Sequence, residues 1–80
     1  MVTKKDFSSW VQEALEAYNG RAAINEVSKY IWEKYESELR KSGDLFYTWQ
    51  YDIRWAAYQL RREGVMRPAE LSPVGIWELY

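Results

Sequence analysis

The chain has 80 residues, of which 48% are hydrophobic and 18% aromatic, and its formal net charge is −1. This length fits one domain, residues 1–80, and the aromatic content excludes a disordered chain. There is no cysteine and no histidine, which excludes disulfides, zinc–thiolate sites and catalysis by a thiol or an imidazole.

The amino-terminal residues indicate neither secretion nor insertion into a membrane. Lys4 and Lys5 are followed by no apolar signal-peptide core, and no run of 18 apolar residues occurs in the chain. A small domain without disulfides suits a reducing compartment. We therefore expect a cytoplasmic protein, such as one of the bacterial cytoplasm, with no contact to a membrane.

A first helix is predicted because apolar residues from Phe7 to Tyr18 recur at the spacing of one helix face. Thr3 and Asp6 form a plausible capping box at its start. Asn19 and Gly20 end it, with glycine supplying the left-handed cap. The apolar face consists of Phe7, Trp10, Val11, Ala14, Leu15 and Tyr18.

A second helix is predicted to begin after Asn25, whose side chain suits an N-cap. Residues 21–23 before it form a short connector or a stub of strand. Ser42 and Gly43 stop the helix at about Lys41. Its inner face consists of Val27, Tyr30, Ile31, Tyr35 or Lys34, and Leu39.

A third helix is predicted over residues 48–63, ended by Gly64, after a linker over residues 44–48 that contributes Leu45 and Phe46 to the core. The buried stripe of this helix consists of Trp49, Ile53, Ala56, Ala57 and Leu60.

After Gly64 the hydrophobic period changes from 3.6 to 2, which predicts strands. Residues 65–67 read as one strand, residues 68–75 as a loop with two prolines, and residues 76–80 as the returning strand. The fold class is thus mainly α (α+β): a winged helix-turn-helix with three helices and a C-terminal two-stranded β-hairpin wing. The expected core comprises Trp10, Val11, Leu15, Val27, Ile31, Ile53, Ala56, Leu60 and Ile76.

Two segments carry a resemblance to a known family. Residues 52–66, with Trp55-Ala56, Leu60 and Gly64 followed by two apolar residues, resemble the N-terminal winged-helix domain of Mrr-type restriction proteins. Residues 75–79 resemble that domain's second wing strand. The resemblance implies that the third helix is a recognition helix. It includes no counterpart of that family's nuclease domain, and the loop before Gly75 lacks the basic residues usual in the family.

Histidine, the commonest general base, and the cysteine thiol nucleophile are missing, and we expect no enzyme, no cofactor and no metal site. The four glycines stand singly, so there is no phosphate-binding loop. No lysine has an acidic residue two positions before it, as a metal-dependent nuclease of the restriction type would. Paired carboxylates such as Glu36 and Glu38 read as a solvated helix face.

The outward face of the third helix is the candidate binding site. Residues 49–67 hold four arginines against one aspartate and one glutamate, whereas residues 6–19 hold three acids and no base. With Ile53 at the centre of the buried stripe, three arginines and two tyrosines span about 80–180° around the helix. Arginine pairs with phosphate and with guanine edges, and an α-helix fits the major groove. The candidate nucleic-acid-binding residues are Tyr51, Arg54, Tyr58, Arg61, Arg62 and Arg67.

Two interpretations of this face remain open. The favoured one is weak, salt-dependent binding of duplex DNA; the arginines could also be ordinary surface charges. The alternative is a protein-interaction module, a homodimer or an adaptor, because exposed Trp, Tyr and Arg are common interface anchors. Aromatics that could build such a patch are Tyr30, Trp32, Tyr35 and Tyr47.

Trp55 is harder to place, because the helical wheel puts it nearly opposite the buried stripe. Large aromatics are highly buried on average. We therefore expect Trp55 to pack beneath the wing, against Trp77 or the second helix, rather than to be exposed for binding. Trp10 and Trp32 are likewise expected in the core.

Overall fold

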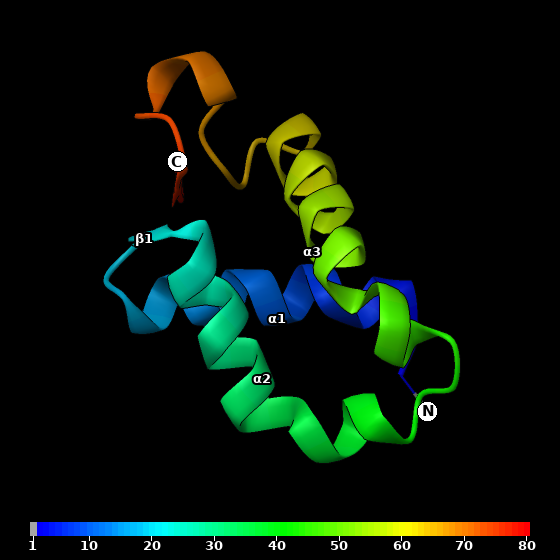
Figure 1. Ribbon diagram of the computed structural model, residues 1–80. Helices are drawn as coiled ribbons and strands as arrows, with labels where there is room; N and C mark the ends of the chain where they lie inside the picture. The colour runs from blue at the N-terminus through cyan, green and yellow to red at the C-terminus, as the bar shows by residue number, and fades with distance from the viewer. Residues whose placement is uncertain (1) are drawn as a thin grey trace.

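The structure, a computed structural model, describes residues 2–80 and combines three helices with a two-stranded antiparallel sheet (Figure 1). Its radius of gyration is 11.9 Å, close to the value of about 12 Å expected for a compact domain of this length. In chain order the elements are α1 (Lys4–Ala17), β1 (Arg21–Ala23), α2 (Ile24–Arg40), α3 (Leu45–Arg62), the short 3₁₀ helix η1 (Ala69–Leu71) and β2 (Ile76–Glu78).

Both ends of α1 follow the sequence prediction. Thr3 is the N-cap, and its backbone N–H donates to Asp6 Oδ2 at 2.9 Å. At the other end, Asn19 and Gly20 both have positive φ, and the Gly20 N–H donates to the Leu15 carbonyl at 2.7 Å. These local signals determine where the helix starts and stops.

Helix α2 begins earlier than predicted. Its N-cap is Ala23, whose N–H donates to the Glu26 carboxylate at 2.8 Å, so the expected cap at Asn25 is wrong and Asn25 lies in the first turn. The Glu26 carboxylate accepts this hydrogen bond at the positive end of the helix, where Ala23 has no side-chain hydroxyl that could act as a cap. The helix is kinked at Tyr35, which has φ −118° and ψ 18°.

Helix α3 begins at Leu45, so the predicted linker over residues 44–48 is wrong. Leu45 and Phe46 are half-buried residues of its first turn. The predicted end at Gly64 holds: this residue has φ +79°, and the Val65 N–H donates to the Leu60 carbonyl.

The sheet differs from the predicted hairpin. Residues 21–23 form β1, and β2 pairs with this strand, with Ala22 opposite Trp77. Residues 65–67 contribute an isolated bridge between Met66 and Leu79 rather than a full strand. The predicted pairing of the two C-terminal segments is therefore present but short, and the longer ladder joins the C-terminal end to the α1–α2 connection.

The core is formed by one face of each helix and by the inner side of the sheet. Ile76 is half-buried, so its predicted place in the core is wrong. Trp77 is buried instead, because neighbouring strand residues point to opposite faces. The buried residues are Phe7, Trp10, Val11, Ala14, Leu15, Ala22, Val27, Ile31, Leu39, Trp49, Ile53, Ala56, Ala57, Leu60, Met66 and Trp77.

The arrangement of the elements leaves one face of α3 open. Helix α1 packs against both α2 and α3 (Figure 1). The segment after α3 turns back past η1 and returns to β1. Helix α3 therefore contacts the molecule along its inner stripe, and its outer side faces solvent.

Candidate nucleic-acid interface

The outer face of α3 carries exposed aromatic and basic side chains. Tyr51 is 83% exposed and Tyr58 49% exposed. Arg54 and Arg62 are exposed on the same side of the helix. The buried stripe of α3, which ends at Leu60, lies on the opposite side of the helix and faces the core. These four side chains are therefore available to a ligand without any rearrangement of the fold.

Two further arginines lie near the C-terminal end of α3, one in its last turn and one in the segment that follows. Arg61 is half-buried, and its Nε donates to the Arg67 carbonyl at 3.1 Å. Arg67 is exposed, with its guanidinium 5.9 Å from the centre of the Tyr80 ring. Arg61 therefore ties the end of the helix to the following segment, while Arg67 adds a cation beside it.

Trp55 is 55% exposed, so its predicted packing beneath the wing is wrong. Its ring stacks on Tyr58, with 5.1 Å between ring centroids and 25° between planes. Arg62 lies over the other aromatic of this pair, 5.9 Å from the Tyr58 centroid. The helical wheel already placed Trp55 outward; the general preference of tryptophan for burial led sequence reasoning to omit it from the site.

Lysines from α1 flank this face. Lys4 and Lys5 line a shallow groove with Trp55, between the start of α1 and the second half of α3. Lys4 also lies 3.8 Å from Asp52, measured from Nζ to Oδ1. Lys5, and Lys4 in its ion pair with Asp52, therefore lie beside the residues that the sequence pattern selected. We call Tyr51, Arg54, Trp55, Tyr58 and Arg62, with the flanking Lys4 and Lys5, the α3 face.

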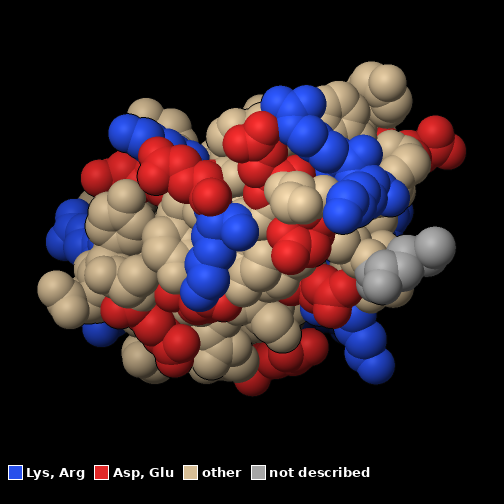
Figure 2. Space-filling view, turned by 90° about the horizontal axis from the view of Figure 1, so that it is seen from below, with Lys and Arg blue, Asp and Glu red and all other residues tan. Residues whose placement is uncertain are grey.

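The charge pattern elsewhere differs. Figure 2 shows the face seen from below, on which acidic and basic side chains are intermingled. On α2, Lys29 pairs with Glu33 at 3.8 Å and Arg40 with Glu36 at 2.7 Å. Paired charges of this kind produce little net field.

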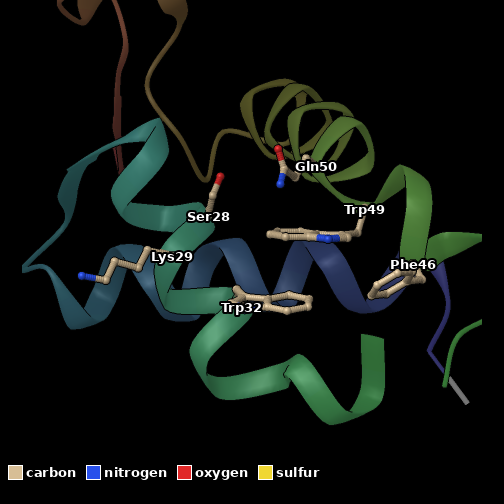
Figure 3. A pocket seen from close by; sticks show the side chains of 6 residues that line it. All are labelled: Ser28, Lys29, Trp32, Phe46, Trp49 and Gln50. Atoms are coloured by element: carbon tan, nitrogen blue, oxygen red, sulfur yellow. The ribbon is translucent and has the colours of Figure 1, made fainter. Parts of the chain in front are cut away.

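An aromatic groove of about 370 Å³ lies between α2 and α3 (Figure 3). Trp32 stacks on Trp49, with 5.9 Å between centroids and 12° between planes. Phe46 lies beside them, 6.3 Å from the Trp32 ring. Trp32 is half-buried rather than fully in the core, so one edge of this cluster reaches the surface.

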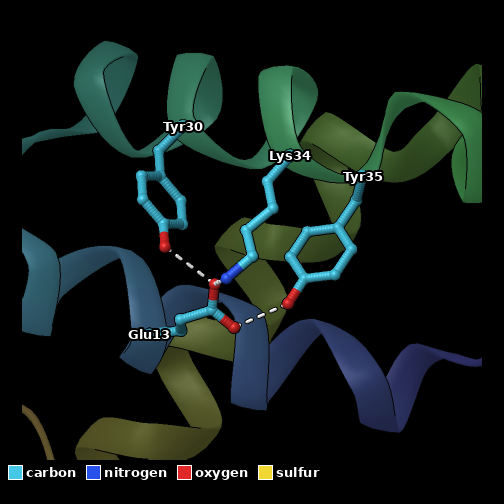
Figure 4. Close-up of polar contacts among 4 residues, drawn as sticks. All are labelled: Glu13, Tyr30, Lys34 and Tyr35. Carbon is cyan, nitrogen blue, oxygen red and sulfur yellow. Dashed lines mark hydrogen bonds and ion pairs between the residues drawn. The ribbon is translucent and has the colours of Figure 1, made fainter.

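Two of the tyrosines considered for a dimer patch have a different role. Tyr30 and Tyr35 both donate their hydroxyls to the Glu13 carboxylate, at 2.8 and 2.6 Å, and Lys34 pairs with the same carboxylate (Figure 4). Hydrogen bonding to Glu13 raises the pKa of Lys34, and burial together with Glu13 raises the pKa of Tyr35 to about 12. These residues join α1 to α2. Tyr47, by contrast, is 83% exposed.

Within residues 2–80, no group of three or more acidic side chains is arranged to hold a metal ion. None of the helices in this part of the chain has the length and apolar character needed to cross a membrane.

Comparison with family models, curated proteins and solved structures finds no significant match to this chain. The resemblance of residues 52–66 and 75–79 to Mrr-type restriction proteins therefore stays a prediction from the sequence.

Proposed function

We propose that this chain is a non-catalytic DNA-binding domain of the winged-helix type, with α3 as its recognition helix. The observation that carries the proposal is the α3 face: Arg54 and Arg62 are exposed on the same side as Tyr51 and Tyr58, away from the core. Arginine forks match phosphate oxygens and the guanine edge, and tyrosine hydroxyls also contact phosphate.

The order of elements supports this proposal. In a winged helix the elements follow one another in the order helix, strand, two helices, strand, wing loop and strand. This chain runs α1, β1, α2, α3, the bridging residue Met66, a loop over residues 68–75 and β2. The α2–α3 pair then corresponds to the helix-turn-helix, whose second helix enters the major groove.

The wing contributes little to binding in this proposal. The loop over residues 68–75 contains Glu70 and no basic residue. Arg67 precedes it and is exposed. The phosphate contacts therefore come from α3, Arg67 and the lysines of α1. With so few contacts, we expect non-specific duplex binding with a Kd of about 10⁻⁴ to 10⁻⁶ M at physiological salt.

The proposal predicts that Arg54→Ala/Arg62→Ala weakens duplex binding and flattens its salt dependence. Each lost phosphate contact should reduce the slope of log K against log salt by about one, because fewer counterions are released. The melting temperature should change little, since neither side chain is in the core. Fluorescence anisotropy with a labelled duplex at several salt concentrations measures both quantities.

A charge-matched control is Lys29→Ala/Lys41→Ala, which removes two exposed cations from α2 and its C-cap. This control should bind duplex DNA nearly as the wild type does. Equal binding by wild type and the Arg54/Arg62 variant, or no binding by wild type at low salt, contradicts the proposal.

A protein-interaction module is the second candidate, and the aromatic groove of Figure 3 favours it. Exposed aromatic surface near Trp32, Phe46 and Tyr47 is the kind of patch that marks protein contacts. Sedimentation velocity over a range of concentrations tests the homodimer form of this function. A dimer that Trp32→Ala dissociates supports it, whereas a monomer at all concentrations leaves an adaptor role for a different protein.

A further inference from the structure

The groove beside Trp55 combines three kinds of group that bind a nucleotide. It has a volume of about 260 Å³ and is lined by residues of α1 and α3. Trp55 supplies an exposed aromatic face, Lys4 and Lys5 supply positive charge, and Ser8 and Gln59 supply hydrogen-bonding groups. Glu63 also lines the groove, and Lys4 is paired with Asp52, so Lys5 is the main cation available to a phosphate. A stacking surface, phosphate-binding cations and polar side chains that can meet a base edge therefore lie in one place.

The face of Trp55 suits an unpaired base better than a base pair. Stacking needs access to the flat face of the base, and in a duplex that face is covered by the neighbouring pairs. An α-helix in the major groove meets base edges instead, where an indole ring offers a single donor. Trp55 is stacked on Tyr58, which holds its ring in position and leaves it 55% exposed.

We infer that this groove binds one unpaired nucleotide of single-stranded DNA, with its base stacked on Trp55, its edge toward Gln59 and its phosphates near Lys4 and Lys5. The inference rests on the proposed function and deepens it. It predicts that the Trp55 stacking surface contributes to the binding of single-stranded DNA and little to that of fully paired duplex, because the paired bases of a duplex have their faces covered by neighbouring pairs.

The test compares Trp55→Ala with Tyr47→Ala. Both remove an exposed aromatic from α3, but Tyr47 lies outside the groove and is 83% exposed. Anisotropy is measured with a labelled 12-nucleotide strand of mixed sequence, alone and annealed to its complement, at one low salt concentration. Trp55→Ala should weaken binding of the single strand about tenfold, the size of one base stack, and should affect the duplex much less. Tyr47→Ala should leave both unchanged.

A second readout reports stacking directly. Binding of the unlabelled strand should quench tryptophan emission in the wild type, and Trp55→Phe should lose most of this quenching while it keeps most of the affinity. Circular dichroism checks that every variant is folded.

The outcomes separate the two proposals. Equal affinity of Trp55→Ala and wild type for the single strand overturns the nucleotide site. If Arg54→Ala/Arg62→Ala still weakens duplex binding in that case, the proposed function stands without it. Absence of binding to both DNAs overturns the proposed function and the nucleotide site together.

Discussion

At the residue scale, Glu13 is the most connected polar side chain of the helix interface. Its carboxylate accepts hydrogen bonds from Tyr30, Lys34 and Tyr35, all on α2, while Glu13 itself lies on α1. Tyr35 also stacks on Trp10, with 3.9 Å between centroids and 7° between planes. Because Tyr35 is the residue at which α2 bends, the cluster holds the kinked helix against α1.

Glu13→Gln should lower the free energy of unfolding at pH 7 by about 1–2 kcal/mol, because three donors lose a charged acceptor at a partly exposed site. Partial burial raises the pKa of Glu13, but hydrogen bonds from Lys34, Tyr35 and Tyr30 outweigh it, so the pKa lies below its ordinary value. A pKa lowered by folding stabilises the protein at neutral pH, and this stabilisation is lost as the pH falls through the folded-state pKa. Urea unfolding from pH 7 to about pH 3 should therefore show the two proteins converging.

The matched control for this prediction is Glu16→Gln, an exposed glutamate of the same helix. Its stability should follow that of the wild type at every pH. A Glu13→Gln variant as stable as the wild type at pH 7 would show that the cluster does not hold α2 in place.

At the element scale, α3 is divided into two faces with different roles. Ile53 and Leu60 are almost fully buried, whereas Trp55 and Tyr58 on the other side are about half exposed. The aromatic residues on the outward side of this helix leave apolar surface exposed that is not needed to pack the helix against the core. The proposed function assigns this outer face to binding, and its side chains should contribute little to stability.

Leu60→Ala should cost about 2–5 kcal/mol of stability, because it leaves a cavity in the core. Trp55→Ala should cost about 1 kcal/mol or less, because it removes a surface stack from a ring that is already half exposed. Urea denaturation of the two variants measures both values. A loss for Trp55→Ala as large as that for Leu60→Ala would show that the indole is packed in the core.

At the scale of the whole molecule, the sheet joins the two ends of the fold. Strand β2 pairs with β1, and the Leu79 N–H donates to the Gly20 carbonyl at 2.8 Å. The C-terminal segment is thereby held against the connection between α1 and α2. Trp77 is the side chain that this pairing turns inward, and it is 4% exposed.

Trp77→Ala should cost about 3–5 kcal/mol, a large part of the total stability of about 4–12 kcal/mol expected for 80 residues. Ile76→Ala, one position earlier in the same strand, should cost clearly less, because Ile76 is half-buried. Thermal unfolding followed by circular dichroism compares the two. A larger loss for Ile76→Ala would mean that the strand has the opposite register, and Trp77→Phe serves as the milder variant if Trp77→Ala does not fold.

The amino-acid sequence by itself determined the features that depend on near neighbours. The cap at Thr3, the stop at Gly20 and the stop at Gly64 all depend on residues within one helical turn. The inward stripes were also predictable, because helical periodicity alone shows which side chains share a face. For the same reason the sequence identified Arg54 and Arg62 as outward-facing.

Tertiary structure alone decided the features that depend on residues far apart in the chain. The pairing of residues 21–23 with residues 76–78 carries no local signal, because three-residue strands are defined by their partner. The partners of Glu13 lie 17 to 22 positions away. Trp55 was misplaced for a related reason: its burial depended on whether the C-terminal segment covers it. That segment returns to β1 instead, so the indole stays at the surface.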